Sequence, residues 1–254
     1  MSTVPATTAA WAAADPYAAA LRCGHGPLFL RRTDGWLLPL EVERWCARAD
    51  AVDRAVLDRC EGTVLDVGCG PGRLVAELAT RGRAVLGIDV SAAAVDRTVR
   101  LGGPALRRSV FEPLPGEGRW GTVLLMDGNV GIGGDPRALL DRVAALLRPG
   151  GLLIAETAPV DVDERAQVQV VGPTASGEAD DHFPWARLGS MALLRYARGW
   201  ERAGQWTAGG RCFVALRSRR SRTASSSAEP PKRTAVISSQ RVRNPTSGSP
   251  VADG

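Results

Sequence analysis

A glycine-dense turn at residues 68–72 constrains the fold of this chain more than any other feature. The four residues before it, VLDV at 64–67, are typical of a buried strand, and an amphipathic stretch over 73–81 follows it. Its glycines are Gly68, Gly70 and Gly72. Glycine adopts backbone angles that other residues avoid, and it has no side chain to keep a ligand away from the main chain. We therefore expect a strand–turn–helix unit that holds a ligand beside backbone N–H groups at the positive end of a helix.

A carboxylate follows at the end of the next predicted strand. Asp89 comes directly after the apolar run LGI at 86–88 and lies 21 residues beyond Gly68. At that place in a βαβ unit, a carboxylate accepts hydrogen bonds from the hydroxyls of a ribose. Alone, the glycines indicate only a turn, and Asp89 with the nearby Ser91 indicates only a helix cap. Together they predict an adenosine-type ligand.

The spacing of the glycines distinguishes between adenosine-containing ligands. Dinucleotide fingerprints read G-x-G-x-x-G, and their third glycine allows close packing of helix on strand. Here Arg73 occupies that third position. Asp66, just before the turn, repels a pyrophosphate but suits the cationic amino group of a methionine moiety. The pattern favours S-adenosylmethionine as the ligand. The alternative is an NAD(P)-dependent oxidoreductase, but this chain has no Tyr-x-x-x-Lys pair for that chemistry, because Lys232 is its only lysine.

Apolar and amphipathic segments alternate from about residue 16 to residue 217, which predicts one α/β domain with a largely parallel sheet. Strands are expected at 63–67, 84–88, 106–110, 122–126, 152–156, 167–171 and 212–216. Helices are expected at 41–47, 51–59, 73–81, 92–101, 136–147 and 185–200. The low-complexity segment 1–15 and the Ser-, Pro- and Arg-rich segment 218–254 have few large apolar residues, and we expect both to be disordered.

The glycine turn, the carboxylate after the second strand and this order of elements resemble the class I S-adenosylmethionine-dependent methyltransferases. The motifs that carry the resemblance are GCGPG at 68–72 and Asp89. The resemblance implies a Rossmann-like, seven-stranded, mostly parallel sheet flanked by helices. It implies further that Asp66 and the turn, with Cys69, hold the methionine end, while Asp89 and the adjacent Val90 hold the ribose.

The same resemblance assigns the adenine contacts to the end of the third strand. Val110 and Phe111 would flank the base, through a backbone N–H and an aromatic ring. Many members have an acid where Ser109 stands, so this chain departs from the pattern there.

The segment after the fourth predicted strand reads DGNVGIGGDP, residues 127–136. It resembles the D-G-N-x-G-I-G-G-D-P loop of an actinobacterial-type subgroup of these methyltransferases. In that fold the loop overlooks the transferable methyl group, so Asp127 and Asn129 are expected to contact ligand and the glycines to permit its close approach. Asp135 before Pro136 indicates a helix cap. An N-P-P-aromatic motif is absent, which disfavours amide and base nitrogens as acceptors.

Methyl transfer is a displacement in which alignment and desolvation supply most of the catalysis. A general base is needed only where the acceptor must lose a proton. His25 and Asp127 are the candidate catalytic residues, and Glu156 is a further candidate. The apolar run at 36–40, WLLPL, is either a wall of the acceptor pocket or a packing surface for the N-terminal helices.

Composition narrows the remaining choices. Residues 217–254 carry eight basic and two acidic residues, a net charge of +6. Since the whole chain has a formal charge of +5, residues 1–216 carry about −1, and the basic character lies in the C-terminal segment. We therefore expect a small-molecule acceptor and no specific nucleic acid partner. Five scattered cysteines and two histidines predict no metal site. No apolar run reaches about 18 residues, so we expect no membrane span and a cytoplasmic location. A non-catalytic S-adenosylmethionine-binding protein remains an alternative.

Overall fold

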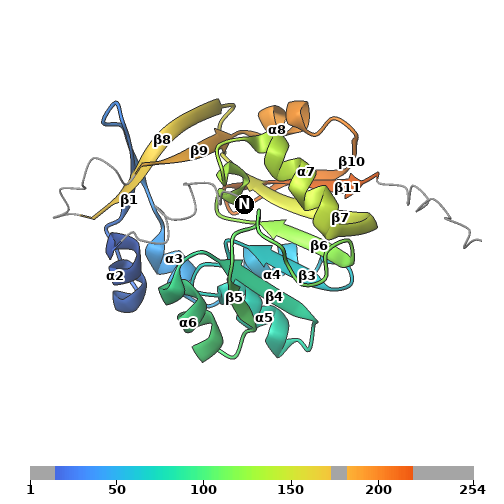
Figure 1. The fold of residues 1–254 in the computed structure, drawn as a ribbon, viewed down its shortest axis with the longest axis horizontal. Helices are drawn as coiled ribbons and strands as arrows, with labels where there is room; N and C mark the ends of the chain where they lie inside the picture. Colours follow the sequence, from blue (N-terminus) through green and yellow to red (C-terminus); the bar gives the residue numbers. More distant parts are fainter. Residues whose placement is uncertain (1–14, 173–181, 220–254) are drawn as a thin grey trace, which may run out of the picture. The chain divides into compact units, whose positions relative to one another are not determined.

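The strand before the glycine turn is an interior strand of a seven-stranded sheet, between β6 and β4 (Figure 1). A computed structural model describes residues 15–172 and 182–219 of the chain. The strand order is β10-β11-β7-β6-β3-β4-β5, in which β3 to β7 run parallel and β11 runs antiparallel to both of its neighbours, β7 and β10. The bounds are β3 Val64–Val67, β4 Val85–Asp89, β5 Ala105–Arg107, β6 Trp120–Leu125, β7 Leu147–Thr157, β10 Trp200–Ala208 and β11 Arg211–Ser218. This is the expected Rossmann-like sheet.

Helices cover both faces of the sheet because its central strands are buried on both sides. Leu65 and Val67 pack with α7 and α8 on one face, whereas Val64 packs with α4 and α5 on the other. In Figure 1, α7 and α8 lie beside β7 and β11 in the upper part of the view, and α5 and α6 lie beside β4 and β5 in the lower part. The bounds are α4 Ala51–Leu57, α5 Arg73–Thr80, α6 Ala92–Arg100, α7 Pro136–Leu146 and α8 Ser190–Tyr196. Asp135 caps α7, as expected, by accepting from two backbone N–H groups.

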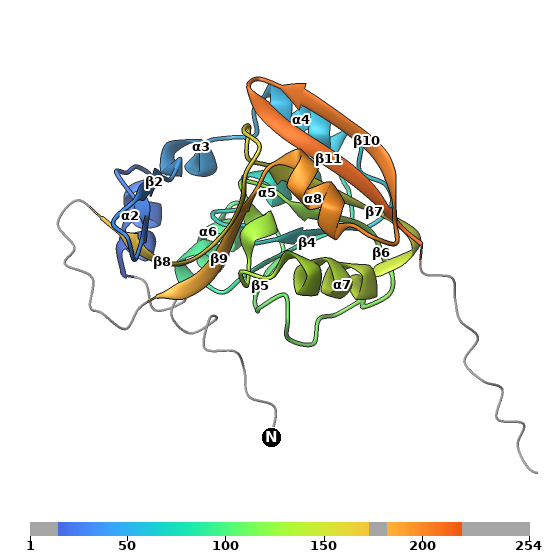
Figure 2. The same ribbon diagram turned by 90° about the horizontal axis from the view of Figure 1, so that it is seen from above.

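A second, four-stranded antiparallel sheet lies beside the first, beyond the ends of its parallel strands (Figures 1 and 2). Its order is β2-β1-β8-β9, and α2 packs against it. The bounds are α2 Asp15–Cys23, β1 Phe29–Arg32, β2 Leu37–Pro39, α3 Val42–Cys46, β8 Asp163–Val171 and β9 Phe183–Leu188. Leu21, Leu28 and Phe183 form its core with other apolar residues. We call this layer the capping sheet.

The capping sheet corrects two predictions. Residues 167–171 do form a strand, but they belong to β8 of the capping sheet, and β10 is the seventh strand of the main sheet. The predicted helix 185–200 is wrong at both ends, because Trp185 lies in β9 and Trp200 begins β10. Only Ser190–Tyr196 is helical. Alternating apolar residues identify a strand, but the choice of sheet depends on partners far away in the sequence.

The two segments predicted to be disordered fall almost wholly outside the described residues. Within the described ranges, the helices are all too short or too polar to cross a bilayer. The same ranges hold no group of three or more side chains suited to a metal ion.

Candidate active site

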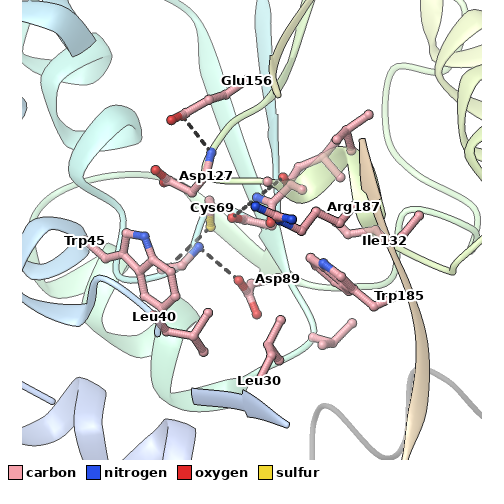
Figure 3. Close-up of a pocket in the computed structure, with 18 of the residues that line it drawn as sticks. Leu30, Leu40, Trp45, Cys69, Asp89, Asp127, Ile132, Glu156, Trp185 and Arg187 are labelled. Atoms are coloured by element: carbon pink, nitrogen blue, oxygen red, sulfur yellow. Dashed lines mark hydrogen bonds between the residues drawn. The ribbon is translucent and has the colours of Figure 1, made fainter. Parts of the chain in front are cut away.

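A cavity of about 470 Å³ lies where the carboxyl ends of the parallel strands meet the capping sheet. One half is lined by the glycine turn and by the residues that follow β4, β5 and β6. The other half is lined by apolar residues of the capping sheet and α3. Figure 3 shows this division, with Cys69 and Asp89 in the middle, Trp45 on one side and Trp185 on the other. Ligands of open α/β sheets bind at this edge.

The glycine turn is held by close packing at two positions. Gly68 has a φ of +70°, and a Cβ there would come within 2.6 Å of the Asn129 amide. Gly72 has a φ of +89°, and a Cβ there would come within 2.4 Å of the Thr98 hydroxyl. Gly68, Cys69 and Gly70 line the cavity, whereas Gly72 does not. Gly72 therefore serves the contact between α5 and α6, and its predicted cofactor contact stays a prediction.

Asp89 ends β4 inside the cavity. Its Oδ2 accepts a hydrogen bond from the Gly70 backbone N–H at 2.9 Å, and its Oδ1 accepts one from Ser91 N–H at 2.8 Å. Burial raises the pKa of this carboxyl to about 6, against the opposing effect of those N–H groups. Asp89 and Val90 line the cavity, so both remain available for the predicted ribose contact.

Asp66 lies one layer below the cavity. It is 2 % exposed in β3, it is not among the cavity-lining residues, and its Oδ2 has no hydrogen-bond partner among the described residues. Burial raises the pKa of Asp66 to about 7, and the guanidinium of Arg73 opposes that rise. The expected contact between Asp66 and a methionine amino group stays a prediction, and it has no support from the geometry because Asp66 does not line the cavity.

The predicted adenine-binding residues lie together. Ser109, Val110 and Phe111 all line the cavity just beyond β5. The strand itself ends at Arg107, earlier than predicted, and these three residues form the turn after it.

Asn129 fastens the glycine turn to the loop after β6. Its side-chain amide donates to Val67 O at 2.9 Å and to Gly68 O at 2.8 Å. It lies at the start of the 3₁₀ turn Asn129–Gly131 and lines the cavity. Asn129 therefore supports the turn through its amide group, in addition to any ligand contact.

Three arginines and three carboxylates form a network along one wall, which we call the charge network. Arg73 binds Asp53 through Nε and Nη2 at 2.8 and 3.1 Å, and it binds Asp127 through Nη1 and Nη2 at 2.7 and 3.1 Å. Arg211 pairs with Asp53 at 2.8 Å and with both oxygens of Glu156 at 2.8 Å. The remaining member, Arg44 from α3, contacts Asp127 at 2.7 Å.

This network bears on the choice of a general base. Burial alone would raise the pKa of Asp127, but Arg73 and then Arg44 hold it below its ordinary value. Glu156 accepts from the Asp127 backbone N–H at 2.9 Å as well as from Arg211. The lowered pKa makes Asp127 a poor proton acceptor, and both carboxylate oxygens of Glu156 are occupied by Arg211. His25 is exposed and does not line the cavity, so its predicted catalytic role also has no support from the geometry.

The acceptor half contains residues that the sequence did not single out. Trp45 from α3 and Trp185 from β9 line it, together with Leu30 and Phe183. Of the predicted run 36–40, residues 38–40 line the cavity, and Trp36 lies outside with 41 % of its surface exposed. The sequence predicted a helix at 41–47 and a strand at 167–171, but it did not indicate that α3 and the capping sheet border the cavity.

Helix α2 covers the glycine turn. The Tyr17 hydroxyl lies 3.6 Å from the place of a Cβ on Gly70, and Tyr17 packs edge-on against Trp45 with ring centroids 6.4 Å apart. Tyr17 is buried and lines the cavity. The N-terminal segment thus closes the cavity through α2, and not through the loop that contains His25.

The glycines of DGNVGIGGDP mainly serve protein contacts. A Cβ on Gly131 would lie 2.0 Å from Ala186 O, and one on Gly134 would lie 2.7 Å from Pro184. A Cβ on Gly133 would come within 2.9 Å of the Phe111 ring. The loop therefore joins the main sheet to β9 of the capping sheet, a role that the sequence did not indicate.

Comparison with known proteins places these features in a family. The family model described as "Methyltransferase domain" matches residues 41–202, which is more than half of the chain. That range contains the glycine turn, Asp89 and the charge network apart from Arg211. No curated protein matches the chain significantly.

Solved structures share the fold at low sequence identity. An S-adenosylmethionine-dependent methyltransferase from Bacteroides fragilis, in complex with S-adenosyl-L-homocysteine, has a TM-score of 0.65 and 21 % identity, and the match covers 85 % of this chain and 97 % of that one. The glycopeptide N-methyltransferase MtfA, also with S-adenosylhomocysteine, has a TM-score of 0.52 and 17 % identity, with 68 % and 90 % covered. A third structure, described under the conversion of a disulfide bond into a thioacetal group during echinomycin biosynthesis, has a TM-score of 0.51 and 18 % identity, with 69 % and 84 % covered.

Proposed function

The chain belongs to the methyltransferase domain family, as an S-adenosylmethionine-dependent enzyme of the class I fold, and we propose that its acceptor is a small molecule. The observation that carries this proposal is the cavity, whose two halves differ in chemistry. The cofactor half is polar and contains Asp89, and the acceptor half is lined mostly by apolar residues of the capping sheet and α3.

The residues of the cofactor half suit S-adenosylmethionine. Asp89 offers a buried carboxylate with unused lone pairs to ribose hydroxyls, since each of its oxygens accepts one backbone N–H. Val110 and Phe111 offer an apolar flank to adenine. The glycine turn exposes main chain at Gly68 and Gly70 on the side of the methionine portion. We assign these residues as the cofactor contacts.

The chemistry needs little from the protein beyond alignment. The bound cofactor supplies an electrophilic methyl group on a sulfonium. The apolar walls from α3 and β9 exclude water from the acceptor. The loop at 127–136 contacts both halves of the cavity and so fixes the acceptor half relative to the cofactor half. The charge network keeps Asp127 and Glu156 in ion pairs, so the acceptor's own lone pair attacks without proton removal by either residue.

The size and enclosure of the cavity support a small acceptor. About 470 Å³ is within the range of small-molecule sites, roughly 300–1,000 Å³. The acceptor half is walled on one side by Leu30 and Leu40 and on the other by Trp185.

Two measurements test the proposal. Calorimetric titration with S-adenosylmethionine, and with NADH and NADPH as controls, should give micromolar binding of the first alone. Formation of S-adenosylhomocysteine is then followed with panels of small molecules, peptides and RNA. Turnover confined to small molecules would support the proposal, and turnover confined to peptides or RNA would contradict it. Binding without turnover on any panel would favour a non-catalytic binding protein.

A further inference from the structure

We propose that the acceptor is a planar aromatic acid whose ring lies between Trp45 and Trp185 and whose anionic group is bound by Arg187. This inference rests on the proposed function, because it assigns the acceptor half of the same cavity. Three observations carry it: the aromatic walls, the pairing of the cavity's charges, and the place of Arg187.

Two indoles face the acceptor half from different elements. Trp45 comes from α3 and Trp185 from β9, and Figure 3 shows them on opposite sides of the cavity. Each is held edge-on by a second ring: Tyr17 lies 6.4 Å from Trp45, and Phe183 lies 6.2 Å from Trp185, between centroids. Fixed aromatic faces favour a flat ring, because stacking adds to the burial of apolar surface.

The carboxylates that line the cavity are already engaged. Glu41 accepts from Arg44, Asp89 accepts from two backbone N–H groups, and Asp127 and Glu156 belong to the charge network. A cationic acceptor would therefore have to compete with an arginine or a backbone N–H group for each of them. An anionic acceptor at Arg187 competes only with a single ion pair, at 3.6 Å from Glu164.

Arg187, in contrast to these carboxylates, is a charged residue of the cavity with only a weak ion pair. It extends from β9, lines the cavity, and has 26 % of its side chain exposed. In the described part of the chain its one ion pair is with Glu164, its cross-strand neighbour in β8, at 3.6 Å. Its guanidinium lies 5.6 Å from the centroid of the Trp36 ring, a cation–π contact that restricts its position. A fixed guanidinium with free N–H groups binds a carboxylate in two-pronged fashion.

The other arginines of the cavity are less suited to this role. Arg44 and Arg73 are paired with Asp127. Arg108 is exposed and adjoins Ser109, in the half assigned to the cofactor. Arg187 alone combines a weak ion pair with a position beside Trp185.

Binding of three probes with one ring system tests the proposal: 2-naphthoate, 2-naphthamide and 2-naphthylmethylamine, titrated into the full chain with and without S-adenosylhomocysteine. We expect 2-naphthoate to bind at least tenfold more tightly than either analogue. Arg187→Gln should weaken 2-naphthoate about tenfold or more and 2-naphthamide less than threefold, and Arg187→Lys should recover part of the loss. Trp185→Leu should weaken the acid and the amide equally.

Arg32→Gln is the matched control. Arg32 also stacks on Trp36, at 5.7 Å, and pairs with Asp34, but it does not line the cavity. Its variant should bind 2-naphthoate like the parent chain. Equal binding of all three probes, or equal loss for all three in Arg187→Gln, would overturn the inference. Binding of S-adenosylhomocysteine without 2-naphthoate would also overturn it while leaving the proposed function intact, whereas failure of S-adenosylhomocysteine itself would count against the proposed function.

Discussion

Arg73 donates hydrogen bonds to Asp127 from two nitrogens and to Asp53 from its Nε, so one guanidinium connects the loop after β6 to helix α4. Arg73 has 5 % of its side chain exposed and Asp53 has 1 %. The pKa of Asp53 is about 2, because hydrogen bonds and charge from Arg73 and Arg211 outweigh the opposing effect of burial. This arrangement stabilises the wall of the cavity and fixes Asp127, whose φ is +56°.

Replacing Arg73 by methionine should destabilise the fold strongly. The variant leaves Asp53 and Asp127 buried with fewer cations, and loss of one partner from a buried pair costs about 3–5 kcal/mol. Urea denaturation at pH 7 measures the loss. Since the folded pKa of Asp53 is below its unfolded value near 4, the stabilisation by this pair is present above pH 4 and disappears as the pH falls through about 2.

Arg81→Met is the control for that measurement. Arg81 follows the same helix and pairs with Glu77 and Asp58, but at the surface, where ion pairs contribute about 0–1 kcal/mol. Similar losses in the two variants would show that burial of the Arg73 pairs is not what matters.

Asp66 should give the ligand-free protein an unusual pH dependence. Burial raises its folded pKa to about 7, above the unfolded value, so the folded state binds the proton more tightly. Stability should therefore fall as the pH rises from about 4 to about 7, by on the order of 2–4 kcal/mol. Asp66→Asn, which is neutral at every pH, should flatten this slope and be more stable than the parent at pH 8. Thermal unfolding measured across that pH range tests the prediction. If the variant kept the parent's dependence of stability on pH, that dependence would come from another group.

Asp89 should make cofactor affinity depend on pH. Its pKa is about 6, and ribose hydroxyls donate best to the ionised carboxylate. Affinity for S-adenosylhomocysteine should therefore rise as the pH increases through about 6 and become constant above it. Asp89→Ala should lose about 1.5–3 kcal/mol of binding, roughly ten- to a hundredfold, and the pH dependence with it. Titration calorimetry at several pH values measures both, and a variant that keeps the parent's affinity would remove Asp89 from the ribose site.

The sequence predicted six of the seven strands of the main sheet, all but β10, and proposed residues for the cofactor half, because both depend on local patterns. A strand, a glycine turn and a carboxylate after the next strand lie within about one βαβ unit, so Gly68 and Asp89 could be assigned from spacing. The same spacing drew attention to Arg73 only as a missing glycine. Its partner Asp53 lies 20 residues before it, and Asp127 lies 54 residues after it. No local pattern indicates that such residues meet.

The acceptor half could not be predicted for the same reason. β8 pairs with β1, which lies more than 130 residues earlier, and the register Phe29 with Val171 is a property of the folded chain. Trp45 and Trp185 become neighbours of one cavity only through this sheet. The apolar run at 36–40 was a candidate wall of the acceptor pocket. In the structure Leu40 lines the cavity, whereas Trp36 lies outside it and is exposed.

The glycines of the 127–136 loop provide the last prediction, on the joint between the two sheets. Gly131→Ala adds a methyl group 2.0 Å from Ala186 O and 2.6 Å from the Trp185 indole nitrogen, so β9 must move. Overpacking of this kind costs about 1–3 kcal/mol. We expect that loss in urea denaturation, with faster amide hydrogen exchange in β9 and weakened acceptor binding.

Gly204→Ala in β10 separates this effect from the general cost of changing a glycine. Its Cβ would meet its nearest neighbour at 3.8 Å, and neither glycine has a positive φ, so only the space around the methyl group differs. The control should therefore retain parental stability within about 0.5 kcal/mol and parental exchange in β9. If Gly131→Ala behaved like this control, the loop would tolerate displacement, and its glycines would be explained by ligand approach instead of by contact with β9.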